Sequence, residues 1–535
     1  MENMLDACRR NGKRKPEEIC FSSPKRDWRF GDLESLSNRL AQAMLALELV
    51  PGDRIACLTK HAAQCTAMTL AAQKIGAVCM PVNWRLAATE VSYILNHGQA
   101  KVLMTDIDFV NILNVIECPS LKKIVLSEDS IANSPPLDHR QSLETWAQAF
   151  PDDDPGYMPH PQETALQLYS SGTTGLPKGV ELSHRSLSAA FQGPVPEAIS
   201  YRGEGSIMLN ALPSFHIAGI GIALMTYSLG GKSVLVPDFI PNHVLDVIVE
   251  HRITHAFLVP AMIQFLLQVP GAATRDYSAL QCLSYGASPI TDQVLVEAMA
   301  TFACKFVQVY GLTETSGAVT ALAAEDHVSE GPKSVLLRSA GKPILGVSLK
   351  VVDHESGETL PDGEVGEIWI KTLQNMKSYW RNPQATNEAF VDRDSDGLGW
   401  FRSGDAGFLQ DGYLFLHDRI KDMIVSGGEN IYPAEIENAM MKHPEIADIA
   451  AFGVPDAQWG ESVKACVVLK PGSMYHDDLK ASSAAIISWT RDRLAHFKCP
   501  RSIDFVESIP RNPSGKILKR ILREPYWRNE HRQIH

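Results

Sequence analysis

The stretch YSSGTTGLPKG, residues 169–179, combines five hydroxyl side chains, three glycines and one lysine within eleven positions. Glycines let backbone N–H groups approach an anion closely, and hydroxyl groups add further donors. A lysine supplies a point charge that suits a phosphate group. The stretch therefore predicts a loop that binds a polyphosphate, and this composition in this order favours that interpretation over a flexible surface turn.

This loop differs from the usual nucleotide-binding loop. A Walker loop needs Gly-Lys followed by Ser or Thr at the start of a helix. Here Lys178 is followed by Gly179, and residues 180–182 have an extended pattern. Pro177 would also disrupt the Walker geometry. The predicted phosphate loop is therefore not a Walker loop.

Length and charge limit the other possibilities. At 535 residues the chain is expected to form two or more domains. Its apolar content of 45% and charged content of 21% are typical of a soluble globular protein. The net charge of −12 argues against a nucleic-acid-binding protein, which usually has a basic surplus.

Targeting and redox signals are weak along the chain. The ten cysteines are scattered without metal-ligand spacing, which indicates buried or incidental thiols. The basic residues of segment 1–15 are followed by no apolar run, and the final four residues are no peroxisomal address. The apolar run 217–231 is too short and glycine-rich to cross a bilayer. We expect a cytoplasmic location, and we leave open peripheral contact with a membrane.

Helix and strand patterns alternate in the first half of the chain. Asp32 can cap a helix whose apolar residues follow helical spacing, and 54–58, 77–81, 102–105 and 123–126 have strand patterns around the helical segment 62–75. This rhythm predicts an α/β fold with largely parallel sheets covered by helices. The helix and strand pattern changes near Asp418, and the remaining residues have the pattern of a small α+β domain.

Two further motifs fit the other parts of a nucleotide site. YGLTET, residues 310–315, follows the strand pattern 305–309. Glu314 there could bind Mg²⁺, which prefers oxygen ligands beside phosphate, and Thr313 could donate to a phosphate oxygen. WFRSGD, residues 400–405, ends in a carboxylate that could accept hydrogen bonds from both ribose hydroxyls, if it lies in a glycine turn. Each motif alone could be an ordinary turn.

Together these motifs resemble those of the adenylate-forming superfamily (ANL), and they occur in the family order over nearly the whole chain. The superfamily includes acyl- and aryl-CoA synthetases, nonribosomal peptide adenylation domains and beetle luciferases. The resemblance implies a large N-terminal domain over 1–417, a hinge at 418–421 and a mobile C-terminal domain over 422–535. ATP, Mg²⁺ and coenzyme A are the implied cofactors and co-substrates.

The resemblance also implies roles for individual residues. Lys516 in the sequence RNPSGKI matches the catalytic lysine, and His216 in PSFH matches a residue beside the carboxylate. Thr174 and Glu314 complete the implied catalytic set, and Glu314 is the metal ligand. The implied nucleotide- and CoA-binding residues are Ser170, Ser171, Gly172, Thr173, Thr174, Gly175, Lys178, Gly286, Ala287, Tyr310, Gly311, Thr313, Asp405, Arg419, Lys421, Gly427, Gly428 and Arg85.

The expected reaction is ATP-dependent activation of a carboxylic acid, followed by thioester formation with coenzyme A. Peptide adenylation domains usually have Asp where His216 stands, which argues against an amino-acid substrate. Residues 217–231 contain no charged side chain, and Gly219 and Gly221 are expected to leave space for an apolar tail. A medium- to long-chain fatty acid is the first choice, and an aryl or cinnamate-type acid or a steroid side-chain acid are alternatives.

Other functions remain open from the sequence. A carrier-protein-loading adenylation enzyme and a luciferase-like oxygenase share the first half-reaction. LGGKS, residues 229–233, resembles a carrier attachment site, but a helix-to-strand turn explains it better. Homodimer formation is also left open.

Overall fold

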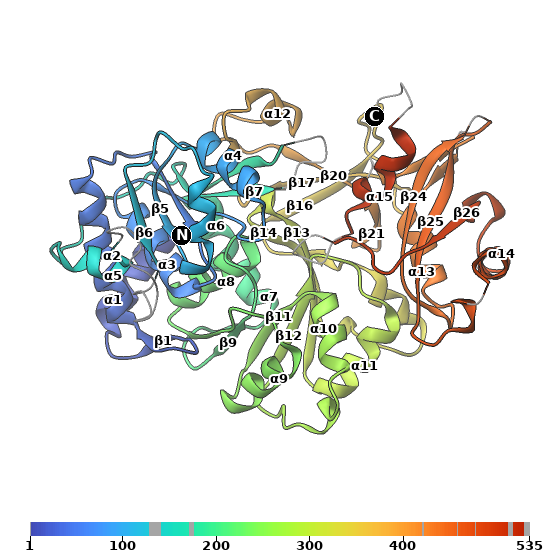
Figure 1. The fold of residues 1–535 in the computed structure, drawn as a ribbon, viewed down its shortest axis with the longest axis horizontal. Helices are drawn as coiled ribbons and strands as arrows, with labels where there is room; N and C mark the ends of the chain where they lie inside the picture. Colours follow the sequence, from blue (N-terminus) through green and yellow to red (C-terminus); the bar gives the residue numbers. More distant parts are fainter. Residues whose placement is uncertain are drawn as a thin grey trace.

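Two helix-covered sheets, one antiparallel sheet and one mixed sheet make up the described chain (Figure 1). This computed structural model describes residues 2–127, 141–170, 176–419, 422–427, 429–456, 458–476, 478–511 and 517–528. The α/β fold with a large N-terminal and a smaller C-terminal domain is confirmed. No helix in these ranges combines the length and the apolar character needed to cross a membrane.

The seven-stranded sheet has the order β18-β8-β7-β4-β3-β5-β6. Its strands from β7 to β6 run parallel, and β8 and β18 add an antiparallel edge. The bounds are β18 Ser378–Tyr379, β8 Lys178–Ser183, β7 Thr164–Ser170, β4 Val78–Pro81, β3 Arg54–Leu58, β5 Ala100–Thr105 and β6 Lys123–Leu126. The four strand patterns found in the first 126 residues therefore correspond to real strands.

The nine-stranded sheet has the order β15-β14-β13-β12-β11-β9-β10-β1-β2, with a parallel centre from β13 to β1. The bounds are β15 Lys342–Pro343, β14 Gly317–Leu322, β13 Lys305–Leu312, β12 Cys282–Gly286, β11 His255–Leu258, β9 Ile207–Asn210, β10 Lys232–Leu235, β1 Ile19–Ser22 and β2 Asp27–Arg29. LGGKS links a helix to β10, as expected.

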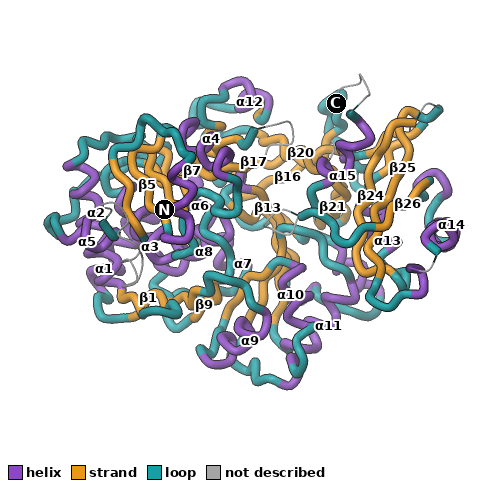
Figure 2. Tube along the Cα trace, viewed as in Figure 1, coloured by secondary structure: helices purple, strands orange, loops and turns teal. Residues whose placement is uncertain are grey.

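Helices cover these two sheets and fill the space between them (Figure 2). They are α1 Met4–Arg14, α2 Phe30–Ala46, α3 Ala62–Gln73, α4 Ala88–Gly98, α5 Leu143–Gln148, α6 His184–Phe191, α7 Pro194–Ala198, α8 Ile217–Ser228, α9 Pro241–Glu250, α10 Pro260–Leu267, α11 Asp292–Phe302 and α12 Pro383–Glu388. Nearly all residues of α3 and α8 are buried, because these helices lie between layers and carry apolar residues on all sides.

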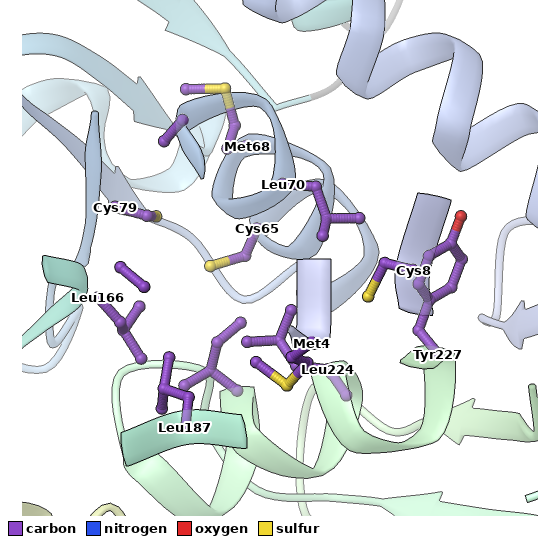
Figure 3. Close-up of a cluster of buried hydrophobic side chains, with 14 of the residues drawn as sticks. Met4, Cys8, Cys65, Met68, Leu70, Cys79, Leu166, Leu187, Leu224 and Tyr227 are labelled. Carbon is purple, nitrogen blue, oxygen red and sulfur yellow. The ribbon is translucent and has the colours of Figure 1, made fainter. Parts of the chain in front are cut away.

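Figure 3 shows the core between these layers, where Met4 and Cys8 of α1 approach α8. Cys65 and Met68 of α3 belong to the same cluster. All ten cysteines are free thiols, and only Cys118 and Cys304 are partly exposed. The cysteines therefore act as small apolar core residues, as the scattered spacing predicted.

Asp32 does not cap α2, which is a correction to the sequence prediction. The helix begins two residues earlier, at Phe30, and Asp32 occupies its third position. There its carboxylate accepts a hydrogen bond from the backbone N–H of Arg29 at 2.9 Å. Asp32 therefore supplies the second half of a capping box, a role that also favours Asp near a helix start.

A five-stranded antiparallel sheet completes the N-terminal part, and a five-stranded mixed sheet, in which β26 pairs parallel with β25, forms the C-terminal part. The first contains β16 Val347–Val352, β17 Gly366–Thr372, β19 Phe390–Val391, β20 Trp400–Gln410 and β21 Tyr413–Arg419. The second contains β22 Ile424–Ser426, β23 Glu429–Ile431, β24 Ile446–Asp456, β25 Gly460–Leu469 and β26 Ser502–Phe505, with helices α13 Pro433–Met440, α14 Leu479–Arg491 and α15 Lys519–Trp527. This second sheet has its own apolar core and lies at the right of Figure 1.

Candidate active site

The described ends of the predicted phosphate loop are held as a strand pair. Ser170 is the last residue of β7 and pairs with Lys178, the first residue of antiparallel β8. Residues 171–175, with the predicted Ser171, Gly172, Thr173, Thr174 and Gly175, lie outside the described residues. The predicted loop thus connects two paired strands, whereas a Walker loop connects a strand to a helix.

Glu314 lies where the two helix-covered sheets meet. It belongs to the short 3-10 turn Thr313–Thr315 that follows β13. The hydroxyls of Ser170 and Tyr379 both donate to Glu314 Oε1, each at 3.1 Å. In the described part of the chain, Glu314 Oε2 has no hydrogen-bond partner, and Glu314 faces a large cleft. Lys178 Nζ lies 5.0 Å from the centre of the Tyr379 ring, which brings the cation to the same place.

This arrangement fits a Mg²⁺ ion that is held mainly by substrate. The described residues contain no group of three His, Cys, Asp or Glu side chains placed to hold a metal ion. Mg²⁺ keeps several waters and commonly takes one or two carboxylates together with phosphate oxygens. Glu314 could therefore supply the protein ligand, and ATP would supply most of the others.

A second group of residues predicted to bind the nucleotide meets around Asp405. The Tyr310 hydroxyl donates to Asp405 Oδ2 at 2.8 Å, although the two residues are far apart in the sequence. Asp405 also pairs through the backbone with Arg419 of β21. The side chain of Arg419 lies outside the described residues. The structure thus brings three sequence-predicted nucleotide residues to one place.

Two local predictions about these residues need correction. Asp405 does not lie in a turn: it is part of the long strand β20, where irregular pairing with β17 and β21 bends the strand, and Gly404 has a φ of +70°. Tyr310 and Gly311 continue strand β13, where a turn was expected. A bulged strand redirects a side chain much as a turn does, so the motif looked like a turn in the sequence.

Gly286 and Gly311 allow close approach of backbone segments. A Cβ at Gly286 would overlap the carbonyl oxygen of Val309 in neighbouring β13, and a Cβ at Gly311 would overlap that of Gly317. Ala287, which follows Gly286, has a φ of +70°, in the left-handed region that is unfavourable for alanine. These residues and Thr313 line the same cleft, so the predicted nucleotide wall is compact and partly strained.

His216 precedes α8 and faces the cleft beside Arg85. Its Nε2 atom is buried, and it has no hydrogen-bond partner among the described residues. Burial, followed by the positive charge of Arg85, lowers the pKa of His216 from 6.5 to about 4. Burial also lowers the pKa of Arg85, whose guanidinium lies 4.5 Å from the Trp84 ring centre. His216 is therefore neutral at pH 7 in the protein without substrate.

An apolar pocket extends from His216 along α8. We call it the acyl pocket, and its walls come from α6, α7 and one face of α8. It is lined by Phe191, Val195, Ile199, Ile217, Ala218, Ile222 and Met225. Among the described wall residues of α6 to α8, His216 is the one titratable side chain. This wall favours an apolar group over a charged one because an unpaired buried charge is costly.

Gly219 and Gly221 do not create the space in this pocket, contrary to the sequence prediction. A Cβ at Gly219 would overlap the carbonyl oxygen of Pro213, and a Cβ at Gly221 would overlap the ring of Phe191. Both glycines are buried and let α8 pack closely against these neighbours. The space lies on another face of α8, beside Ala218 and Ile222.

Four predicted residues belong to the C-terminal part of the chain. Lys421, Gly428 and Lys516 lie outside the described residues. Ile517, which follows Lys516, pairs with Arg511 and lines the cleft. Gly427 has a φ of +61°, and its N–H donates to the carbonyl of Trp459 at 2.8 Å. A side chain there would meet the Trp459 ring, so this glycine is also required by packing.

Tyr379 is a site residue that the sequence did not reveal. It contacts Glu314 by its hydroxyl and Lys178 by its ring. Tyr379 belongs to β18, a two-residue edge strand that pairs with β8. Nothing in the local pattern Lys-Ser-Tyr-Trp distinguishes it from an ordinary surface segment, because its role depends on strand pairing across about 200 residues.

The cleft that contains these groups lies between the N-terminal and C-terminal parts. Its volume is 4530 Å³, and its walls include residues of β12, β13, β20, α13 and α15. Such a volume exceeds that of a single small-molecule pocket, which is typically about 300–1,000 Å³. The cleft therefore has room for a nucleotide, an acid and a third substrate.

Comparison with known proteins agrees with this geometry. The family described as "AMP-binding enzyme" matches residues 8–380, and the family described as "AMP-binding enzyme C-terminal domain" matches residues 435–516. The chain belongs to the AMP-binding enzyme family. It is therefore an AMP-forming, acid-activating ligase, and the resemblance to adenylate-forming enzymes is confirmed.

Two curated relatives are similar over nearly their whole length. Fatty acid–[acyl-carrier-protein] ligase ScoC of Streptomyces coeruleorubidus is 39% identical over 511 residues, covering 94% of this chain and 93% of ScoC. Long-chain-fatty-acid–CoA ligase FadD13 of Mycobacterium tuberculosis is 34% identical, covering 98% of this chain and 99% of FadD13.

A solved relative is similar in fold. The ATP-bound structure of MatB from Rhodopseudomonas palustris has a TM-score of 0.86 and 27% identity, covering 99% of this chain and 100% of MatB. The apo structure of the same protein, with the same coverage, has a TM-score of 0.75.

The low pKa of His216 predicts a pH-dependent stability. Between pH 4 and 6.5 the unfolded chain binds a proton that folded His216 rejects, so stability is complete above this window and falls as pH decreases. At about pH 5 the loss relative to neutral pH is up to about 2 kcal/mol. Chemical denaturation of the wild type and His216→Phe at both pH values should show a smaller loss for the variant.

Two other histidines provide the comparison. The variant His243→Gln should lose as much stability at about pH 5 as the wild type does, because the His243 side chain is exposed in the folded protein. Buried His184, whose pKa is also lowered to about 4, supplies a loss that both variants retain. Equal pH dependence in wild type and His216→Phe would show that His216 is protonated as easily as an exposed histidine.

Proposed function

We propose that this chain uses ATP to convert an apolar monocarboxylic acid into an acyl-adenylate and then transfers the acyl group to a pantetheine thiol. The observation that carries this proposal is the hydrogen bond of Ser170 to Glu314. It brings the predicted phosphate loop to the predicted metal ligand, and the acyl pocket opens into the same cleft. This proximity supports an adenylation site at the cleft.

The first half-reaction needs position and charge more than a base. A carboxylic acid with a pKa of about 4–5 is already a carboxylate at neutral pH and can attack the α-phosphate directly. The main requirement is stabilisation of negative charge on the phosphates. Lys178 and the loop after Ser170 would hold the β- and γ-phosphates, and the Tyr310–Asp405 pair would hold the nucleoside. Bound at Glu314, Mg²⁺ would neutralise phosphate charge.

Lys516 is proposed as the second cation at the reacting phosphate. Its neighbour Ile517 lines the cleft, which supports a position near the substrates. The higher similarity to ATP-bound than to apo MatB supports the proposal that the two domains have the arrangement for adenylation. Thioester formation then requires Lys516 to leave, and we propose that the hinge at 418–421 allows this rotation. The domain boundaries 1–417 and 422–535 belong to the same proposal.

The second substrate supplies a thiol with a pKa of about 8.5, which needs an open path to the acyl-adenylate. Coenzyme A is the first choice for this thiol, and Arg85 at the mouth of the acyl pocket could meet its phosphates. A carrier protein is the second candidate, favoured by the 39% identity to a ligase that loads an acyl carrier protein. Both acceptors present the same pantetheine arm.

The acyl pocket supports a medium- to long-chain fatty acid. From Ile217 to Met225 its wall follows α8 for eight residues, or about 12 Å, enough for an extended chain of about ten carbons. Aryl, cinnamate-type and steroid side-chain acids are the alternatives that an apolar wall also accepts.

The direct test is a panel of carboxylic acids assayed for pyrophosphate release. Reactions would contain no acceptor, coenzyme A or a phosphopantetheinylated carrier protein. We expect release with apolar acids and a stimulation by one acceptor that identifies the thiol. No release with any acid would contradict the proposed adenylation, and release that neither acceptor stimulates would contradict the ligase assignment.

The role of Lys516 can be separated from that of the hinge. Lys516→Ala should reduce adenylation by about 10²–10³-fold, the usual effect of removing a charge-stabilising group. Thioester formation from supplied acyl-adenylate should change little in this variant. Lys421→Pro should show the opposite bias, since proline would restrict the hinge. Equal loss of both half-reactions in Lys516→Ala would contradict its role.

The depth of the acyl pocket predicts a chain-length effect. Met225→Trp should fill the deep end and lower kcat/KM for long acids by about tenfold or more, while short acids keep their rate. Ala218→Phe, nearer His216, should affect all acids because it narrows the entrance. Measuring kcat/KM for a series of acids of about four to sixteen carbons checks both variants. Unchanged chain-length preference in Met225→Trp would place the acyl chain elsewhere.

A further inference from the structure

Helix α4 carries two aromatic side chains that reach both described ends of the phosphate loop. Tyr93 and His97 are one turn apart on α4, and their rings stack with centres 5.4 Å apart and an angle of 17° between planes. Figure 1 shows α4 beside β7, the strand that leads into the loop. The two rings therefore form one stacked pair on the same face of α4.

His97 holds the first end of the loop. Its Nδ1 atom lies 2.8 Å from the hydroxyl of Tyr169, the residue before Ser170. Gln167 donates to the same hydroxyl at 3.2 Å, and the hydroxyl lies 3.5 Å from the carbonyl oxygen of Ile94, a longer contact than the one to His97. Burial and the charge of Arg381 lower the pKa of His97, which favours the neutral ring, and in the tautomer with its proton on Nε2 the Nδ1 atom accepts from Tyr169. Tyr169 is therefore fixed by a donor and an acceptor.

Tyr93 holds the second end. Its hydroxyl donates to the carbonyl oxygen of Pro177 at 3.4 Å. Pro177 immediately precedes Lys178, which pairs with Ser170 across the base of the loop. Helix α4 thus contacts the residue before Ser170 at one end of the loop and the residue before Lys178 at the other.

The helix end is itself fixed to the same hairpin. The indole N–H of Trp380 donates to the carbonyl oxygen of His97 at 3.0 Å, and its backbone N–H donates to that of Gly179 at 2.7 Å. The guanidinium of Arg54 lies 3.3 Å from the Trp380 ring centre. Trp380 thus joins the C-terminal end of α4 to the residue after Lys178.

From these contacts we infer that Tyr93 and His97 are positioning residues that hold the two described ends of the predicted phosphate loop, at Tyr169 and Pro177, in place for phosphate binding. The inference rests on the proposed adenylation. A loop that surrounds a phosphate group pays an entropic cost if it must become ordered on binding, and fixed ends reduce this cost. The loop serves pyrophosphate, which takes part in the first half-reaction alone. Loss of the two contacts should therefore weaken ATP use and leave thioester formation intact.

The test compares variants of α4 by ATP–pyrophosphate exchange with the best acid of the panel. Tyr93→Phe removes one hydroxyl, and His97→Leu removes the Nδ1 acceptor. We expect each to raise KM for ATP by about three- to tenfold, the size of one hydrogen bond, and their combination to exceed either. His97→Asn, whose side-chain oxygen can replace Nδ1, should recover most of the loss. Thr89→Ala, on the exposed surface of α4, is the matched control and should equal wild type.

Two further measurements distinguish positioning from a general structural role. Thioester formation from supplied acyl-adenylate and the thermal midpoint should match wild type in Tyr93→Phe and His97→Asn. Unchanged KM for ATP in Tyr93→Phe and His97→Leu would overturn the inference, and so would an equal loss of both half-reactions. Failure of the proposed function looks different, because wild-type protein would then show no exchange with any acid.

Discussion

The hydrogen bond between Ser170 and Glu314 joins the two helix-covered sheets, and the rest of the site is arranged around it. Ser170 ends β7 of the seven-stranded sheet, and Glu314 follows β13 of the nine-stranded sheet. Gly286 also stands at the carboxyl end of its strand, β12. In α/β proteins ligands bind outside the carboxyl ends of parallel strands, where side chains from several strands converge. Here two sheets contribute such ends to one cleft.

Much of this site could be predicted because its residues lie in short local motifs. The motifs at 169–179, 310–315 and 400–405 each hold several polar residues beside glycine, and the structure brings Ser170, Lys178 and Glu314 together. The strand patterns in the first half also gave the correct elements, since buried parallel strands are short continuous apolar runs. Motifs and strands of this kind can be predicted from the sequence without any knowledge of tertiary contacts.

The errors and omissions depend on tertiary contacts. Gly219 and Gly221 suggested space, but Pro213 and Phe191 fill it, and the sequence does not show which neighbour faces a glycine. Tyr379 joined the site through pairing of β18 with β8, which no local pattern reveals. Asp405 looked like a turn residue because a bulged strand and a turn use the same residue types. The roles assigned to the individual site residues stay predictions, and for Thr174, Lys421, Gly428 and Lys516 the position lies outside the described residues as well.

The acyl pocket and the nucleotide residues belong to different parts of the fold. Helices α6, α7 and α8 form the pocket wall, whereas strand ends and their turns carry Glu314, Tyr310 and Asp405. A replacement at Ile222 or Met225 would change the shape of the proposed acyl pocket, and neither side chain takes part in the hydrogen bonds of Glu314 and Asp405. Selection could therefore change the preferred acid in single steps while the energy-consuming chemistry stays constant. Because of this separation, substitutions on one face of α8 could give new substrate ranges within the same fold.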